Sequence, residues 1–150
     1  MLYGGCIRIF FHDMFKVHAI EGGIAMGFWI FMLLMDLLIP LTMIGFGRYF
    51  LENAPKEINA IFGYRTTMSI KNRATWIFAH HCCGKIWYVS GIISLIITII
   101  VIVTVMGQTE NTIGTVGGII CGVQILLLIG SIIPTEKALK RTFDRNGNRR

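Results

Sequence analysis

Residues 55–87 read PKEINAIFGYRTTMSIKNRATWIFAHHCCGKIW, and this stretch decides how the chain is organised. It is the only long stretch too polar to lie in lipid, and apolar runs flank it on both sides. Within it, residues 62–66 form a compact aromatic–glycine–cation–hydroxyl turn, FGYRT. Gly63 allows a positive φ or a close backbone approach, and Arg65 offers five fixed donors that can clamp a carboxylate or a phosphate. We therefore interpret the rest of the chain as a membrane scaffold that holds this loop.

Three apolar runs outside the loop predict the fold class. They are residues 24–46, 86–106 and 115–133, and each is close to the ~20 residues that span a hydrocarbon core. The chain of 150 residues is 54% hydrophobic, and only 15% of it is charged, too little to cover the surface of a soluble domain. We expect an all-α integral membrane protein, a single membrane domain over residues 1–150 with three transmembrane helices.

The charges predict the orientation of these helices. The loop 47–85 and the tail 134–150 carry most of the Lys and Arg, whereas the connection 107–114 carries Glu110 and neither Lys nor Arg. By the positive-inside rule, the loop and the C-terminus are cytoplasmic, and the short connection and the N-terminus lie outside. The net charge of +6 is better explained by this bias than by nucleic-acid binding. The basic tail is expected to be drawn to anionic lipid head groups.

The order of polar residues in and around the loop carries a resemblance to a known family. The pattern P-K-x-x-N-x-x-F-G-Y-R-T, then S-x-x-N, T-W-x-x-A and G-K before an apolar helix, resembles the SdpI family of bacterial membrane proteins. The resemblance covers roughly residues 39–106. It implies immunity to a secreted sporulation-delay toxin, a location in the bacterial plasma membrane, and a peptide toxin and a cytoplasmic regulator as partners. The residues that match the family pattern, and that are therefore expected to form a binding site, are Asn59, Phe62, Gly63, Tyr64, Arg65, Thr66, Ser69, Asn72, Thr75, Trp76, Ala79, Gly84 and Lys85.

The segments on either side of the first span are predicted as helices. Residues 1–23 have apolar side chains near helical spacing with charges between them, which indicates a short amphipathic helix in the outer interface. The alternative for this segment is an incomplete fourth span. After the loop, we expect one long helix from about Asn72 to Met106, capped by Ser69 or Asn72. Beyond Pro134 a cytoplasmic helix can continue to Phe143, and residues 145–150 are expected to be frayed.

The spacing of side chains on the long helix suggests two features. Trp76, His80, Cys83 and Trp87 recur at helical spacing and so share one face. Trp76, Trp87 and Tyr88 also suit the aromatic belt at a membrane interface. The run of two His and two Cys at residues 80–83 is not expected to bind a metal, because four consecutive helical residues cannot close a tetrahedral site. We expect neither a metal nor another cofactor.

Polar and small residues inside the spans predict helix contacts. Asp36 is costly at mid-membrane, so it should face protein or water, either neutral or paired with Arg65 or Lys85. Pro40 is expected to kink the first span. Gln124 is most simply a former of hydrogen bonds between helices. Gly114, Gly118 and Gly122 make a small-residue groove, expected either to pack against Ser90, Ser94 and Thr98 or to form a homodimer.

Three functions fit these observations. The first is protection against a membrane-active peptide, as the resemblance implies, by binding the toxin or shielding its target. The second is a minimal transporter or channel that uses Asp36 and Gln124. The third is a structural or signalling subunit of a larger membrane complex. The sequence has no nucleotide-binding glycine loop, nucleophile–base pair or carboxylate pair, so an enzyme is not expected.

Overall fold

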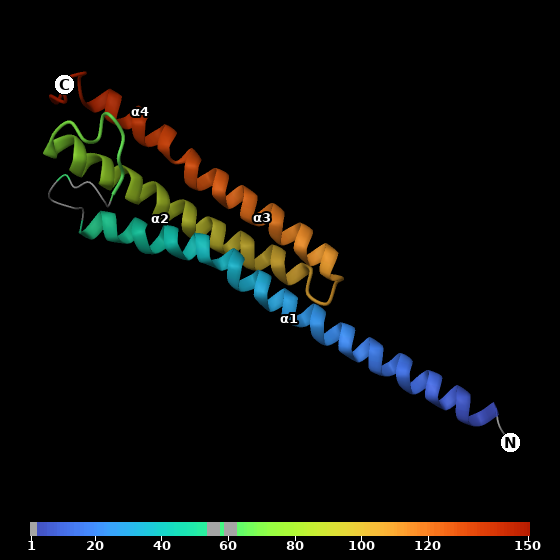
Figure 1. Cartoon of the computed structure of the whole chain (residues 1–150). Helices are drawn as coiled ribbons and strands as arrows, with labels where there is room; N and C mark the ends of the chain where they lie inside the picture. Colours follow the sequence, from blue (N-terminus) through green and yellow to red (C-terminus); the bar gives the residue numbers. More distant parts are fainter. Residues whose placement is uncertain (1–2, 54–57, 59–62) are drawn as a thin grey trace.

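The computed structural model describes residues 3–53, 58 and 63–150, with side chains from residue 22 onward. The described part consists of four α-helices and no β-strand: α1 (Tyr3–Glu52), α2 (Arg73–Thr104), α3 (Glu110–Gly130) and α4 (Ile132–Thr142). In Figure 1, α1 and α2 run antiparallel, α3 returns beside α2, and α4 prolongs α3 toward the C-terminus. The N-terminal part of α1 extends beyond the bundle formed by the other helices.

The predicted all-α membrane architecture is confirmed. Three helical stretches are long and apolar enough to cross a membrane, namely Gly22–Glu52, Arg73–Thr104 and Glu110–Thr142. Their outer faces expose Leu, Ile and Val side chains, such as Leu34, Ile100 and Leu126, which are 60%, 60% and 70% exposed. A surface of this kind is stable against lipid and unstable against water.

The N-terminal segment differs from the prediction. Residues 3–23 do not form a separate helix, because α1 is one continuous helix of 50 residues. The prediction placed a boundary between residues 23 and 24, but Gly22 and Gly23 do not interrupt α1, because a glycine inside a helix costs only about 1 kcal/mol and leaves the backbone hydrogen bonds intact. Pro40 also lies inside α1 without ending it, and Figure 1 shows α1 changing direction along its length. The location of this segment in the outer interface stays a prediction.

The contact between α1 and α2 is made by glycines that allow the two backbones to approach. A Cβ atom on Gly84 would lie 2.9 Å from the carbonyl oxygen of Gly47, and one on Gly47 would lie 2.6 Å from the backbone nitrogen of Tyr88. Two turns further along α2, a Cβ atom on Gly91 would lie 2.9 Å from the Ile44 side chain. No larger residue fits at these positions without moving the helices apart.

The predicted glycine groove on α3 has a different role. Gly118 and Gly122 are exposed with open space around them, and only Gly114 approaches another helix, at Phe28 of α1. The prediction that this groove packs against the Ser90–Ser94–Thr98 face of α2 is therefore wrong. The glycine that packs is Gly117, one residue away, which is buried against Met32 and Asp36 of α1. A shift of one residue turns a helix by about 100°, so the repeat faces outward.

Polar contacts join the three spans at mid-bundle. The side-chain nitrogen of Gln124 donates to the Thr98 hydroxyl at 2.8 Å and to the Asp36 backbone carbonyl at 3.0 Å. This confirms Gln124 as a hydrogen-bond former between helices. Asp36 is 1% exposed and faces α3, as predicted. Lys85 is exposed, and Arg65 lies in the loop at the end of the bundle, so neither charge pairs with Asp36 at mid-span.

Each end of the bundle is tied by an indole. At the hairpin end, Trp29 Nε1 donates at 2.8 Å to the carbonyl of Ile102, one of the four carbonyls that the end of α2 leaves without a helical partner. At the other end, Trp87 Nε1 donates at 2.7 Å to the Ser131 hydroxyl, at the junction of α3 and α4. These two bonds fix the middle of α1 and the end of α3 against α2.

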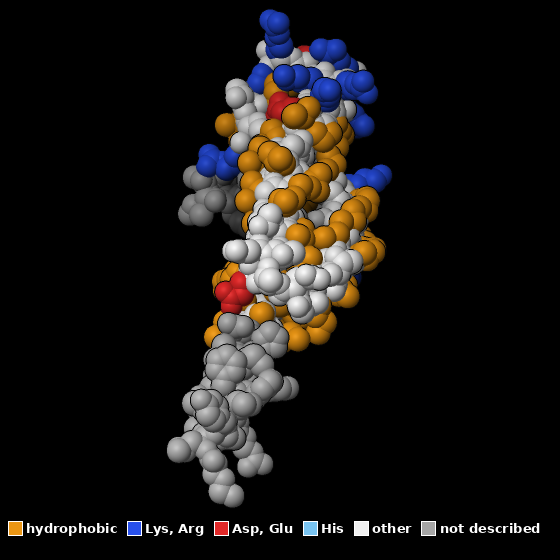
Figure 2. Space-filling view, turned by 90° about the vertical axis from the view of Figure 1, so that its right-hand side faces the viewer, with side chains coloured by type: hydrophobic (Ala, Val, Ile, Leu, Met, Phe, Trp, Pro, Cys, Tyr) orange, Lys and Arg blue, Asp and Glu red, His pale blue; other side chains and the backbone are white. Residues whose placement is uncertain are grey.

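The loop and the C-terminal tail lie at the same end of the molecule, and the hairpin between α2 and α3 lies at the other (Figure 1). Lys and Arg side chains gather at the loop end, which is the blue region of Figure 2. Exposed cations there include Lys71, Arg73, Lys137, Lys140, Arg141, Arg145, Arg149 and Arg150. The described loop residues and the tail therefore lie at one end of the bundle. Their location on one side of a membrane, and the identity of that side, stay predictions.

Candidate functional site

The loop that precedes α2 is held against the helix by His80. The backbone amide of Tyr64 donates to His80 Nε2 at 3.0 Å, and His80 Nδ1 lies 2.7 Å from the Trp76 carbonyl. Because Nε2 accepts, the proton of the neutral ring is on Nδ1, which donates to that carbonyl. His80 is fully buried, so the imidazole is an internal anchor for the loop.

Gly63 makes this anchor possible. Its φ is +118°, a conformation that residues with a side chain rarely adopt. A Cβ atom at this position would also overlap His80 Nε2 and would lie 3.2 Å from the Trp76 ring. Two independent constraints therefore require glycine here, one from the backbone conformation and one from the close approach of the imidazole.

The rest of the loop is closed by hydroxyl groups. The amide of Thr66 donates to the Ser69 hydroxyl at 2.8 Å, and that hydroxyl reaches the Tyr64 carbonyl at 3.0 Å. Asn72 is the N-cap of α2. Its side-chain oxygen accepts from the Thr75 amide at 2.9 Å, and the Thr75 hydroxyl accepts from the Asn72 amide at 3.1 Å. This reciprocal pair is a capping box, and it confirms Asn72 as the start of the long helix.

Beneath the loop lies a small core in which three elements meet. It contains Tyr64 from the loop, Ala79 and Cys83 from α2, and Leu139 and Phe143 at the end of α4. The Tyr64 hydroxyl donates to the Ile132 carbonyl at 3.3 Å. Burial raises the pKa of the Tyr64 phenol above its usual range, and the nearby Glu136 carboxylate raises that pKa further. Tyr64 is therefore a neutral packing residue and a hydrogen-bond donor.

Trp76 is also part of this interior. Its side chain is fully buried, and the centroid of its ring lies 4.3 Å from that of the His80 ring. The expectation that Trp76 belongs to an interfacial aromatic belt is therefore wrong, because its indole contacts protein on all sides. The predicted shared face of α2 is confirmed, since Trp76, His80 and Cys83 are buried together and Trp87 is half-buried.

The C-terminal residues fold back onto the loop. The Asn72 side-chain nitrogen donates to the Gly147 carbonyl at 2.7 Å, and Phe143 forms an antiparallel bridge with Arg149. The Asp144 carboxylate accepts from the amides of Asn146 and Asn148, both at 2.8 Å. The expectation of a frayed end over residues 145–150 is wrong, because the Asn72–Gly147 bond ties the end to the start of α2 and the other bonds close the turn.

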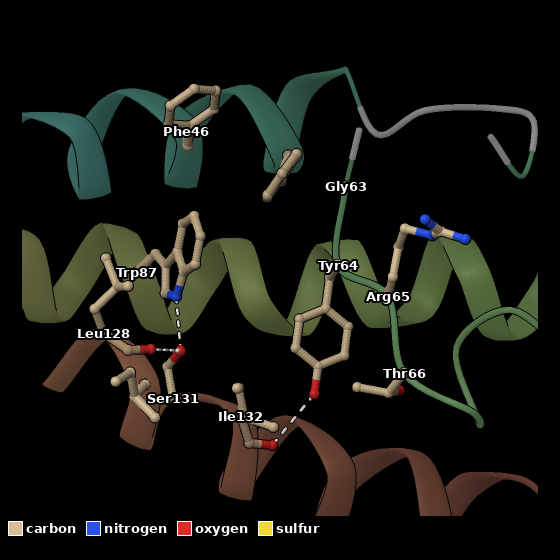
Figure 3. Close-up of a pocket in the computed structure, with 11 residues that line it drawn as sticks. Phe46, Gly63, Tyr64, Arg65, Thr66, Trp87, Leu128, Ser131 and Ile132 are labelled. Atoms are coloured by element: carbon tan, nitrogen blue, oxygen red, sulfur yellow. Dashed lines mark hydrogen bonds between the residues drawn. The ribbon is translucent and has the colours of Figure 1, made fainter. Parts of the chain in front are cut away.

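An apolar groove runs along the bundle beside the loop, and Figure 3 shows it. Its volume is about 360 Å³. Phe46 of α1, Trp87 of α2, and Leu128 and Ile129 of α3 line its apolar part, and Tyr64, Arg65 and Thr66 line the end at the loop. The Arg65 side chain is exposed and extends away from the Tyr64 hydroxyl in Figure 3. The groove is therefore apolar where the helices line it and polar at the end that the loop lines.

The family-like residues predicted from the sequence divide into two groups. Most of them build the loop and its support: Gly63, Tyr64, Thr66, Ser69, Asn72, Thr75, Trp76, Ala79 and Gly84 are buried or half-buried. Arg65 and Lys85 are exposed. Asn59 and Phe62 lie outside the described residues. The structure thus brings most of the motif together, but as a scaffold that presents Arg65.

Sequence reasoning missed several residues with structural roles. Gly47, Gly91 and Gly117 make the close contacts between helices. The Ser131 hydroxyl accepts the hydrogen bond of Trp87 at the wall of the groove. A signal for the glycines was present, since Gly84 and Gly91 are seven residues apart and so lie on one face of α2. Among the described residues, no group of three or more His, Cys, Asp or Glu is placed to hold a metal ion.

Comparison with known proteins supports a family assignment. A model of the SdpI/YfhL protein family matches residues 56–135, which is more than half of the chain and includes the loop, α2, α3 and the start of α4. No curated protein and no solved structure gives a significant match.

Proposed function

The chain belongs to the SdpI/YfhL protein family, and from this premise we propose that it protects a bacterial plasma membrane against a membrane-active peptide. In this proposal the protein binds the peptide or shields its target. The loop and tail are cytoplasmic, because they carry the cations that the positive-inside rule assigns to that side. A cytoplasmic regulator that senses the bound state would contact the same surface.

The observation that carries this proposal is the way the loop is built. Residues 63–72 are fixed by the Tyr64–His80 bond, the Ser69 hydroxyl and the Asn72 cap, yet the Arg65 side chain is exposed. A fixed loop that presents a guanidinium is suited to bind a carboxylate, because the backbone that carries it is already ordered before binding. Most of the family-like residues that the structure describes are thus explained as a presenting scaffold, and Arg65 as the recognition residue.

The test is a protection assay in a host that is sensitive to the toxin. Wild type, Arg65→Lys, Arg65→Ala and Lys71→Ala would be expressed, and the amount of each in the membrane fraction would be measured. Lys71 is the matched control, because it is an exposed cation of the same loop. We expect Lys71→Ala to protect fully and both Arg65 variants to insert but fail, since lysine lacks the planar fork.

Other outcomes decide against parts of the proposal. Full protection by Arg65→Lys would show that a positive charge alone is sufficient. Loss of Arg65→Ala from the membrane fraction would show that Arg65 supports the fold instead of recognition. Absence of protection by the wild-type chain, at normal membrane levels, would refute the immunity function itself.

A second candidate function is favoured by one observation at mid-bundle. In the described part of the chain, Asp36 Oδ2 and Gln124 Oε1 are buried acceptors without a hydrogen-bond partner. Two such acceptors within the spans are typical of a site for a proton or a small cation. Flux measured in proteoliposomes that contain wild type or Asp36→Asn tests this function. An Asp36-dependent flux would support transport, and equal flux in both would exclude a role for this carboxyl group.

A further inference from the structure

The groove beside the loop opens on the outer surface of the bundle. Two of its lining residues, Phe46 of α1 and Ile129 of α3, are 42% and 56% exposed on helices that are apolar enough to cross a membrane. Such side chains face lipid when the protein is in a bilayer. A molecule already in the membrane can therefore enter this groove sideways.

The polarity of the groove changes along the bundle axis. At one end lie the rings and alkyl groups of Phe46, Trp87 and Leu128, and at the other end lies Arg65 (Figure 3). The Lys and Arg side chains in Figure 2 gather at that same end of the molecule. An occupant that complements this arrangement has a long apolar part along the helices and an anionic group at the loop. The volume of the groove, about 360 Å³, is within the range of specific small-molecule sites.

We propose that the groove is a binding site for one anionic phospholipid of the leaflet on the loop side, with an acyl chain between α1 and α3 and its phosphate at Arg65. A zwitterionic lipid offers the same chain but no net charge to the basic end, so the site discriminates by head group. Trp87 lines the groove, and its position there is fixed by its bond to Ser131. This lipid site goes beyond protection against a peptide and does not depend on it.

The test measures which lipids remain on the purified protein. The full chain would be placed in nanodiscs of phosphatidylglycerol and phosphatidylethanolamine in equal amounts and then released for native mass spectrometry. We expect one retained phosphatidylglycerol per chain. Arg65→Gln should lower the preference for phosphatidylglycerol about fivefold, the factor expected for one cation near a charged membrane surface. Lys71→Gln, which alters an exposed cation outside the groove lining, should leave it unchanged.

A second pair of variants tests the acyl part. Ile129→Trp fills the groove, and Ile125→Trp adds the same ring one turn away on α3, at a residue that is 45% exposed and outside the groove lining. Ile129→Trp should abolish retention and Ile125→Trp should not. Quenching of tryptophan fluorescence by brominated phosphatidylglycerol should saturate at a low lipid fraction in wild type and lose its saturable part in Trp87→Phe.

Three results would overturn the lipid site. Equal retention in Ile129→Trp and Ile125→Trp would show that the groove is not occupied. An unchanged head-group preference in Arg65→Gln would show that the site does not select lipids by the charge of the head group. A dimer mass, with loss of the dimer in Ile129→Trp, would show that a second copy of the chain covers the groove. Because none of these measurements includes a toxin, their failure is separate from failure in the protection assay.

Discussion

At the scale of single residues, Gly63 carries two constraints that can be separated by experiment. Gly63→Ala should destabilise the protein by about 1–3 kcal/mol for backbone strain, with a further loss from overlap with His80. Gly107→Ala is the matched control, since Gly107 has a φ of +77° but open space around it. Thermal unfolding in detergent measures both variants. Equal losses would show that the approach of His80 to Gly63 does not limit the loop.

The hydrogen bond from Tyr64 to His80 leads to a second prediction at this scale. His80→Ala leaves a buried amide without an acceptor, which costs about 1–3 kcal/mol, and should release the loop. Trypsin should then cleave after Arg65 and Lys71 faster than in wild type. His81→Ala, at the exposed neighbouring position, should leave the cleavage rate unchanged. An unchanged rate in His80→Ala would mean that the loop is held without the imidazole.

At the scale of elements, the two sets of glycines should respond differently to substitution. Gly84→Ala inserts a methyl group 2.9 Å from the Gly47 carbonyl and must push α1 and α2 apart, which should cost about 1–3 kcal/mol. Gly118→Ala meets open space and should leave the unfolding temperature of the monomer unchanged or slightly raised. Unfolding temperatures in detergent, measured together with the oligomeric state, test this. A loss of oligomers in Gly118→Ala would assign the outward groove on α3 to self-association.

The C-terminal turn leads to a prediction of pH dependence. Hydrogen bonds from the Asn148 amide and then the Asn146 amide hold the pKa of Asp144 below its usual 3.8. Since the folded-state pKa is lowered, this stabilisation is present above pH 3.8 and is lost as the pH falls through the folded-state pKa. Hydrogen exchange at the amides of Asn146 and Asn148 should therefore stay slow at neutral pH. Below the folded-state pKa of Asp144, the C-terminal turn should open more often and exchange at these amides should show it. Asp144→Ala should show the open state at every pH.

At the scale of the whole molecule, the charge asymmetry predicts the orientation. A cysteine at position 109 should react with a membrane-impermeant maleimide in intact cells, and one at position 140 should react only after the membrane is opened. Thr109 and Lys140 lie at opposite ends of the bundle and are both exposed, so accessibility within the protein does not differ. Labelling of position 140 in intact cells would reverse the orientation.

The sequence predicted the parts of this molecule that depend on local pattern. Apolar length identified the three spans, and the Asn72–Thr75 pair identified the start of α2. The polar residues inside the spans were also informative, because a buried amide such as Gln124 must find a partner on another helix. In the loop, the family-like order of residues predicted a structured unit, and the part that the structure describes, residues 63–72, is held by hydrogen bonds to His80 and within itself.

What the sequence could not reveal depends on rotation and on distant contacts. The repeat Gly114–Gly118–Gly122 is as regular as any packing motif, and only the register of α3 shows that Gly117 is the buried residue. The hydrogen bond from Tyr64 to His80 joins residues 16 positions apart. Because its donor is a backbone amide, the pattern of side chains in the sequence does not predict it. The bond from Asn72 to Gly147 spans 75 positions, so the ordered C-terminal turn had no local signal.

The three tryptophans give this protein its own optical reporters. Trp29 joins α1 to the end of α2, Trp76 lies in the core beneath the loop, and Trp87 bonds to the junction of α3 and α4. Each indole thus samples a different joint of the molecule, and the hydrogen bonds of Trp29 and Trp87 would be lost if their joints opened. Emission spectra of variants that retain one tryptophan at a time would follow opening at the hairpin end, in the core and beside the groove separately, without an added dye.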